Sequence, residues 1–247
     1  MHRKERLDSI MEIVKQYKYV TVKFLTEELH YSSATINRDL NTLANQKLIV
    51  RSYGGAELLK AKTIPLIFRY HKMKAEKNRI AKKAAEFICD GDTVFIDGST
   101  TAQYIGQYIL NKKDITVITN NIYLASYLSE NSVNTVCLGG KIVEPPNMLC
   151  GSETVENASH YKADKFFFST SGIDECGNIV SGELYWLMHR TMAKNSKEQF
   201  FLVDHGKNTC DASRVAFTLN EISHFISDFD VAEDIKEKFP DTAFIKV

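Results

Sequence analysis

Apolar residues in the first part of the chain recur at helical spacing in three short segments. The spacing predicts helices at residues 5–17, 22–29 and 33–45. Thr21 and Ser32 precede the second and third helices and are good N-caps, because a hydroxyl side chain can accept a hydrogen bond from a backbone N–H of the first turn. Helices this short are not stable alone in water, so we expect the three to pack around one core.

A strand-like run follows the third helix. It covers residues 47–57, contains the Gly54–Gly55 pair that suits a tight turn, and is interpreted as a β-wing. Pro65 and the lack of periodic apolar positions indicate a linker after the wing, and a basic helix is predicted at residues 74–89. The pattern therefore predicts a small winged helix-turn-helix domain at residues 1–57, a linker at 58–73 and a larger domain at 74–247.

Beyond Gly91 the pattern changes to short apolar runs that end in polar or glycine-rich turns and are followed by helical stretches. The runs lie at residues 93–96, 115–118, 135–138, 165–168, 199–203 and 224–226, with a last one near 243–247. This alternation is typical of an α/β domain with a largely parallel sheet. Ligand sites of such sheets lie at the carboxyl ends of the strands, so the residues directly after each run are the first candidates for a site.

The net charge of zero conceals an asymmetry between the two parts of the chain. Residues 1–83 contain 18 Lys and Arg against 8 Asp and Glu, whereas residues 84–247 contain 13 against 23. This distribution indicates a nucleic-acid-binding surface attached to an acidic body. A solvated basic helix with no nucleic-acid partner is the alternative that charge alone leaves open.

Several classes of protein are disfavoured by what the sequence lacks. The first six residues are mostly charged, and no run of about 18 apolar residues follows, so we expect neither a signal peptide nor a membrane span, and a cytoplasmic location. The cysteines are odd in number, scattered and without a Cys-x-x-Cys pair or histidines at metal-ligand spacing. We interpret them as reduced structural thiols and expect no metal and no cofactor; they are Cys89, Cys137, Cys150, Cys176 and Cys210.

The start of the third predicted helix carries side chains that suit base recognition. With Ile36, Leu40 and Leu43 turned inward, the residues left facing outward are Ser33, Ala34, Thr35, Asn37 and Arg38. Arginine can bind guanine through two hydrogen bonds, asparagine suits adenine, and hydroxyl groups bind base edges or phosphates. An ordinary surface helix is the alternative, because Ser, Thr and Asn are also common cap residues.

Basic residues near this helix could hold the DNA backbone. Arg3, Arg6, Lys23, Lys47 and Arg51 are candidate phosphate contacts, although each could also be merely solvated. A tyrosine at the wing tip could pack on a sugar or cover the core. The DNA-binding candidates are therefore Ser32, Ser33, Thr35, Asn37, Arg38, Lys47, Arg51 and Tyr53.

Some fifty residues of this region resemble a known family. The run Thr35-Ile36-Asn37-Arg38-Asp39-Leu40, followed by Leu43, Leu48, Arg51 and Gly54-Gly55-Ala56, is similar to the helix-turn-helix signature of DeoR-type regulators. The usual form of that signature reads Thr-Ile-Arg-Arg-Asp-Leu and closes with Arg-x-x-Gly-Gly-Ala. One departure is that Asn37 stands where the family usually has the first arginine, so this position could read adenine or contact DNA differently.

The first strand of the larger domain is followed by a loop that suits an anion. The loop reads Asp97-Gly98-Ser99-Thr100-Thr101 and is predicted to lead into a helix through Tyr108. Backbone N–H groups, hydroxyls and the positive end of a helix are what a phosphate group requires. The alternative is a well-capped helix after a tight turn.

Four further strand ends should meet this loop if the sheet is parallel. They are 119–121, 139–141, 171–174 and 204–207. Their glycines allow close approach of the backbone, Asn and Asp can bind hydroxyls, and lysine offers a compact charge for phosphate, so we expect a polyol phosphate pocket. The effector-binding candidates are Asp97, Gly98, Ser99, Thr100, Thr101, Asn120, Gly139, Gly140, Lys141, Gly172, Asp204 and Lys207.

The same five segments, in this order, are similar to the sensor domain of DeoR regulators, so the resemblance covers the rest of the chain. It implies a Rossmann-like fold related to ribose-phosphate isomerases, a phosphorylated sugar as effector, and assembly as a homodimer or homotetramer. Two departures put the details of the ligand in doubt. Gly98-Ser99 replaces the common Ser-Gly order, and His205-Gly206 replaces the usual serine pair before Lys207.

The leading hypothesis is a transcriptional regulator that represses a sugar or polyol operon, binds a double-stranded DNA operator and is controlled by a phosphorylated sugar. A rival hypothesis is a sugar-phosphate isomerase or deaminase with an appended DNA-binding domain, in which Asp97, Asp174, Glu183, Asp204 or Lys207 could supply a base. No local pairing of these groups marks a catalytic centre, so we expect no enzyme activity. A third reading is a nucleic-acid-binding protein without small-molecule control.

Overall fold

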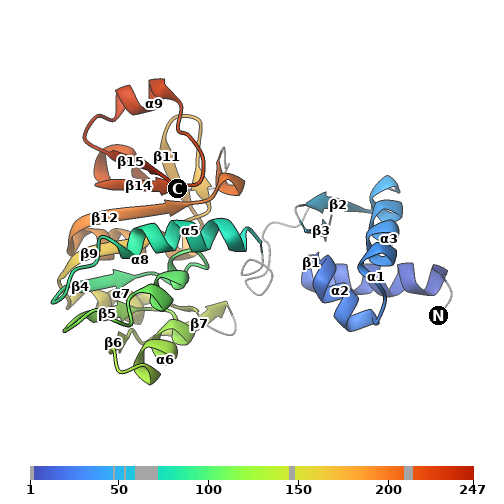
Figure 1. Ribbon diagram of the computed structural model, residues 1–247, viewed down its shortest axis with the longest axis horizontal. Coiled ribbons are helices and arrows are strands. Elements are labelled where there is room, and N and C mark those ends of the chain that lie inside the picture. Colours follow the sequence, from blue (N-terminus) through green and yellow to red (C-terminus); the bar gives the residue numbers. More distant parts are fainter. Residues whose placement is uncertain (1–2, 47, 53, 59–71, 145–147, 209–213) are drawn as a thin grey trace. The chain divides into compact units, whose positions relative to one another are not determined.

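The computed structural model describes the chain apart from residues 1–2, 47, 53, 59–71, 145–147 and 209–213 (Figure 1). The chain divides into two compact units, Met1–Lys72 and Met73–Val247, and each is described by itself below. Most of the linker expected at residues 58–73 lies outside the described residues.

The smaller unit consists of three helices and a small antiparallel sheet with strand order β1-β3-β2. Its elements are α1 (Arg3–Tyr17), β1 (Tyr19–Thr21), α2 (Val22–Leu29), α3 (Ser33–Asn45), β2 (Ile49–Ser52) and β3 (Gly55–Leu58). The Thr21 side chain accepts a hydrogen bond from the N–H of Phe24, and that of Ser32 from the N–H of Thr35. The three helices, both caps and the wing predicted from the sequence are confirmed.

The turn of the wing requires its two glycines for different reasons. Gly54 has a φ of 72°, a conformation that side chains with a Cβ rarely adopt. Gly55 has no room for a side chain, because a Cβ there would lie 2.2 Å from the carbonyl oxygen of Val20 on β1. Gly54 therefore permits the turn, and Gly55 permits the close passage of β3 beside β1.

The larger unit is built on a seven-stranded sheet with strand order β15-β14-β12-β9-β4-β5-β6, which runs from top to bottom of this unit in Figure 1. All neighbouring strands of this sheet are parallel. Its strands are β4 (Thr93–Ile96), β5 (Thr116–Thr119), β6 (Asn134–Cys137), β9 (Ala163–Phe168), β12 (Ser196–Val203), β14 (His224–Ser227) and β15 (Ala243–Lys246). The predicted α/β fold with a largely parallel sheet is confirmed.

Helices cover both faces of this sheet, because its central strands are apolar on both sides. Phe166 and Phe168 of β9 belong to one buried cluster and Phe167 to another, as expected when successive side chains of a strand point to opposite faces. The cluster around Phe167 includes residues of α5 (Lys74–Ala85), the 3₁₀ helix η1 (Ala102–Tyr108) and α6 (Ile122–Glu130), and the other includes residues of α7 (Ser152–Ser159) and α8 (Glu183–Lys194).

Several short elements were not predicted from the sequence. They are β1 in the smaller unit and, in the larger one, β7 (Lys141–Glu144), β8 (Met148–Cys150), β10 (Gly172–Ile173), β11 (Asn178–Ser181), β13 (Arg214–Thr218), η2 (His205–Lys207), η3 (Leu219–Glu221) and α9 (Glu233–Lys238). Two predicted helices also differ. The basic helix ends at Ala85 instead of residue 89, and the helix after the Asp97 loop is a 3₁₀ helix, whose tighter turns place Gly106 against Leu124 of α6.

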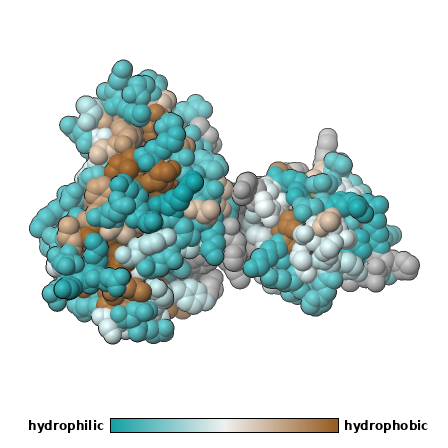
Figure 2. All heavy atoms as spheres, viewed as in Figure 1, coloured by the Kyte–Doolittle hydropathy of each residue, from teal (hydrophilic) through white to brown (hydrophobic). Residues whose placement is uncertain are grey.

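The surface of each unit, on the face visible in Figure 2, is mostly hydrophilic. No helix in the described part of the chain combines the length and apolar character needed to cross a membrane.

Candidate functional site

The outward face of α3 carries an arginine and an asparagine. A helix turns about 100° per residue, so Ala34, Arg38 and Asn41 lie opposite the buried Ile36 and Leu40. All three outward residues are exposed, and within the described residues the Arg38 guanidinium has no hydrogen bond or ion pair. Sequence reasoning had missed Asn41, although its position three residues after Arg38 places it on the same face.

The other candidates at the start of α3 are partly engaged within the unit. The Ser32 oxygen caps the helix and lies 3.0 Å from the Thr35 hydroxyl, while Ser33 is exposed. Asn37 is half-buried, and its Oδ1 accepts a hydrogen bond of 2.8 Å from Nη2 of Arg51 on β2. Two further candidates, Lys47 and Tyr53, lie outside the described residues.

Two arginines of α1 that we had considered as phosphate contacts are turned toward a buried carboxylate. Nε of Arg6 donates to Oδ2 of Asp39 at 2.5 Å, and Nε of Arg3 lies 3.9 Å from Oδ1 of the same residue. The side chain of Asp39 is only 1 % exposed, and its hydrogen bond raises the pKa of Arg6 above the usual value. Arg6 therefore neutralises a buried charge between α1 and α3 and is not available to DNA.

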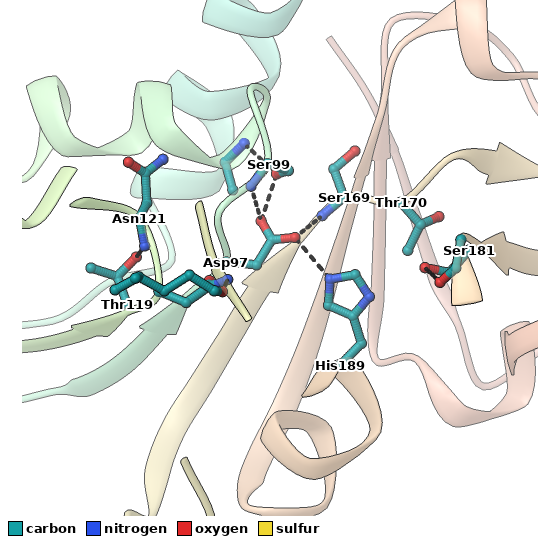
Figure 3. A network of polar contacts seen from close by, with 12 residues as sticks. Asp97, Ser99, Thr119, Asn121, Ser169, Thr170, Ser181 and His189 are labelled. Carbon is teal, nitrogen blue, oxygen red and sulfur yellow. Dashed lines mark hydrogen bonds and ion pairs between the residues drawn. The ribbon is translucent and has the colours of Figure 1, made fainter. Parts of the chain in front are cut away.

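The carboxyl edge of the large sheet brings together residues from the ends of β4 and β9 and from α8 around Asp97 (Figure 3). Oδ1 of Asp97 accepts hydrogen bonds from the backbone N–H of Ser99 at 3.1 Å and from its hydroxyl at 2.5 Å. Oδ2 accepts from the N–H of Ser169, after β9, and lies 3.1 Å from Nε2 of His189 on α8. Since Asp97 is 1 % exposed, this network fixes the loop after β4 against β9 and α8.

His189 was not among the candidates from the sequence. It is 3 % exposed and packs near the rings of Phe166 and Phe168, with centroid distances of 6.3 and 5.8 Å. A histidine at an apolar position of a helix was the only available signal, because its partner Asp97 lies 92 residues away in the sequence.

Two lysines reach the hydroxyl groups of this edge from different elements. Nζ of Lys207 donates to Oγ of Ser169 at 2.7 Å, and Nζ of Lys77, on α5, donates to Oγ1 of Thr100 at 3.2 Å. Lys77 is only 3 % exposed, and it was not among the candidates from the sequence. Lys77 lies three residues before Ile80 and seven before Ala84, so it falls on the buried face of α5. This spacing could have identified it from the sequence.

Four buried polar atoms at or beside the loops of this edge have no hydrogen-bond partner among the described residues. They are Oγ1 of Thr101, Oδ1 of Asn120, Nδ1 of His189 and Oδ2 of Asp204. Buried polar groups are nearly always paired in folded proteins, and each exception calls for an explanation such as a bound water or ligand. The edge therefore combines these buried polar atoms with two ammonium groups, those of Lys77 and Lys207.

The remaining effector candidates lie at the same edge but outside the Asp97 network. Gly98 packs closely against Met148 of β8 and the Asn120 side chain, since a Cβ at Gly98 would lie 2.8 and 3.2 Å from their nearest atoms. The segment from Gly139 to Lys141 enters the β7–β8 hairpin and is exposed, and Gly172 lies in β10. The 3₁₀ helix after Thr101 also gives a weaker anion site than the expected α-helix, because fewer N–H groups align at its start.

The described residues contain no group of three or more His, Cys, Asp or Glu side chains that could hold a metal ion. The four described cysteines are free thiols, and Cys210 lies outside the described residues.

Both units match known families. Residues 6–62 match the DeoR-like helix-turn-helix domain, and residues 72–229 match the DeoR C-terminal sensor domain. The HTH-type transcriptional repressor GlcR of Bacillus subtilis is 36 % identical over 92 % of this chain and 89 % of its own length. The glycerol-3-phosphate regulon repressor of Escherichia coli is 34 % identical over 84 % of this chain and 83 % of its own length. The lactose phosphotransferase system repressor of Lactococcus lactis is 31 % identical over 84 % of each chain.

Among solved structures, ribose 5-phosphate isomerase from Plasmodium falciparum aligns with a TM-score of 0.41 and 18 % identity over 55 % of this chain and 53 % of its own. A likeness of this size says nothing about the activity of this chain. The two family matches, together with the sequence identity to named repressors over most of their length, establish the family of this chain. The chain belongs to the DeoR family of transcriptional regulators and is a regulatory protein, not an enzyme.

Proposed function

We propose that this protein is a repressor of a sugar or polyol operon whose operator affinity is controlled by a phosphorylated sugar bound at the carboxyl edge of the large sheet. The observation that carries the effector half is the convergence at this edge of Lys77, Lys207 and the four buried polar atoms without a partner among the described residues. Ammonium groups suit a phosphate, and the hydroxyl, carboxamide, imidazole and carboxylate atoms suit sugar hydroxyls.

The relatives support the chemical class of this effector. One is named for a regulon of glycerol 3-phosphate, a phosphorylated polyol, and another for a lactose phosphotransferase system. In the effector role we place Ser99, Thr100, Thr101, Asn120, Asp204 and Lys207, with Gly98 allowing close approach. Asp97, Gly139, Gly140, Lys141 and Gly172 are assigned to the loops that shape the pocket.

On the DNA side, we assign base contacts to Arg38 together with Ser33 and Thr35, and backbone contacts to Ser32, Lys47, Arg51 and Tyr53. A homodimer or homotetramer would place two such heads on repeated or palindromic half-sites. A ligand changes operator affinity only if it binds two conformations of the protein with different affinity, which links the two activities.

Thermal unfolding of the full chain with a panel of sugar phosphates and the matching free sugars tests the effector half. A ligand that binds only the native state at 100 times its Kd adds about 2.7 kcal/mol to the free energy of unfolding. We expect one phosphorylated compound to stabilise the protein, its free sugar to have no effect, and the same compound to change affinity for operator DNA. Stabilisation by no phosphorylated compound would instead favour a regulator without this effector class.

A further inference from the structure

The contact between α3 and the wing occupies the position at which α3 departs from the usual DeoR signature. Asn37 stands where an arginine is common, and both ends of its carboxamide are used inside the unit. Its Nδ2 donates to the backbone oxygen of Ser33 at 2.9 Å, and its Oδ1 accepts from Nη2 of Arg51 at 2.8 Å.

This geometry conflicts with direct reading of a base by Asn37. An asparagine that reads adenine must accept a hydrogen bond at Oδ1 and donate one from Nδ2 at the same time. Each end of the carboxamide keeps one further hydrogen-bonding position, but the bonds to Ser33 and Arg51 set its orientation. Asn37 also lies on the flank of α3 instead of the outward face that carries Arg38.

Arg51 is held against α3 by its hydrogen bond to Asn37. The residue is half-buried, and its Nη1 atom is inaccessible and has no partner among the described residues. Arg51 pairs with Ala56 in the wing, and the next pair, Ser52 with Gly55, leads directly into the Gly54 turn. Fixing the guanidinium therefore fixes the tip of the wing relative to α3.

We propose that Asn37 is a positioning residue, which holds Arg51 and thereby the wing in place on α3, and that base reading by this helix is carried by Arg38. The inference rests on the DNA-binding function proposed above and adds a division of roles within it. Loss of Asn37 then weakens binding to all duplexes by a similar factor, whereas loss of Arg38 relaxes the preference at particular base pairs.

A double-mutant cycle on the full chain measures the contact. The protein first selects its preferred duplex from a random-sequence double-stranded DNA library, and Kd for that duplex is then measured for Asn37→Ala, Arg51→Met and the double variant. Methionine keeps the aliphatic packing of Arg51, and alanine is the best helix former, so both variants should fold, as thermal unfolding checks. We expect the double variant to bind no more weakly than the poorer single variant, which corresponds to a coupling of about threefold or more.

The matched control is the cycle of Arg38→Ala with Arg51→Met, two residues without a shared contact in the described structure, whose effects should multiply. Repeating the selection with each single variant measures its base preferences, which a purely structural change would not alter. Asn37→Ala should keep the base preferences of the parent, and Arg38→Ala should lose one or two of them.

Independent effects of Asn37→Ala and Arg51→Met, or loss of an adenine preference in Asn37→Ala alone, would overturn the inference. Failure of the parent chain to select any duplex would be a different result. It would remove the proposed DNA-binding function itself, and the division of roles with it.

Discussion

Asp97 lies at the proposed effector site, but its contacts favour a role in shaping the loop over one in touching the ligand. Its carboxylate is saturated by Ser99, Ser169 and His189, and its negative charge would repel a phosphate. We therefore interpret Asp97 as the residue that shapes the loop, and the lysines as those that meet the ligand. The sequence pattern marked this loop as a candidate but could not separate the two roles that we propose here.

Lys77 provides the sharpest test of this site at the scale of one residue. Lys77→Met keeps most of the buried aliphatic volume but removes the ammonium group and its hydrogen bond to Thr100, so the protein should fold with its stability lowered by about 1–3 kcal/mol. A hydrogen bond to a charged group contributes about 1.5–3 kcal/mol, so we expect the sugar phosphate that stabilises the parent to bind at least about tenfold more weakly. Isothermal titration calorimetry measures the change.

The control for Lys77→Met is Lys74→Met, which removes the same charge from an exposed position of the same helix. This variant should bind like the parent. Equal losses in the two variants would mean that only the overall charge of α5 matters, and unchanged binding in Lys77→Met would place the ligand elsewhere.

At the scale of elements, the end of α2 carries a correctable strain. His30, its C-cap, has a φ of 56° and is exposed, so it occupies the left-handed conformation without a visible compensating contact in the described residues. His30→Gly should stabilise the smaller unit slightly, because relief of about 1–2 kcal/mol of left-handed strain exceeds the roughly 0.4–1 kcal/mol that glycine adds to the entropy of the unfolded chain, whereas His30→Val should destabilise it. Native-state hydrogen exchange of the α2 amides in the full chain measures both effects, and slower exchange in the valine variant would contradict the argument.

Elements whose pattern is local could be predicted from the sequence, and elements that depend on distant partners could not. The parallel strands are apolar on both faces and α1 to α3 have apolar stripes, so their own residues identify them. β1 is only three residues long and pairs with Gly55–Glu57, far along the chain, so nothing in its own sequence marks it as a strand.

In the candidate site, too, the parts with a local pattern could be predicted and the parts that depend on distant residues could not. The loops at the strand ends were predicted because a parallel sheet places them at one edge. Lys77 and His189 were missed because each is a polar residue within an apolar stripe, and only the fold shows that Thr100 and Asp97 lie beside them. The geometry of their contacts depends on packing between α5, α8 and the sheet, which a sequence pattern does not contain.

At the scale of the whole molecule, the positive surplus of residues 1–83 should make DNA binding strongly dependent on salt. Each phosphate contact contributes a slope of about −0.9 to the plot of log K against log salt concentration for duplex DNA. Lys23, at the start of α2, is exposed and only loosely paired with Glu27 at 3.8 Å, so it is free to serve as one such contact. Lys23→Ala should therefore reduce the slope by about 0.9 and leave the base preferences unchanged.

Lys113→Ala is the matched control, because it removes one exposed positive charge from the larger unit. Fluorescence anisotropy titrations between low and physiological salt give the slope for each variant and for the parent. If Lys113→Ala lowers the slope as much as Lys23→Ala, net charge and not a located contact determines the salt dependence. If only Lys23→Ala does so, the basic surface acts through individual phosphate contacts of the helix-turn-helix unit, and the acidic body makes no such contact at this position.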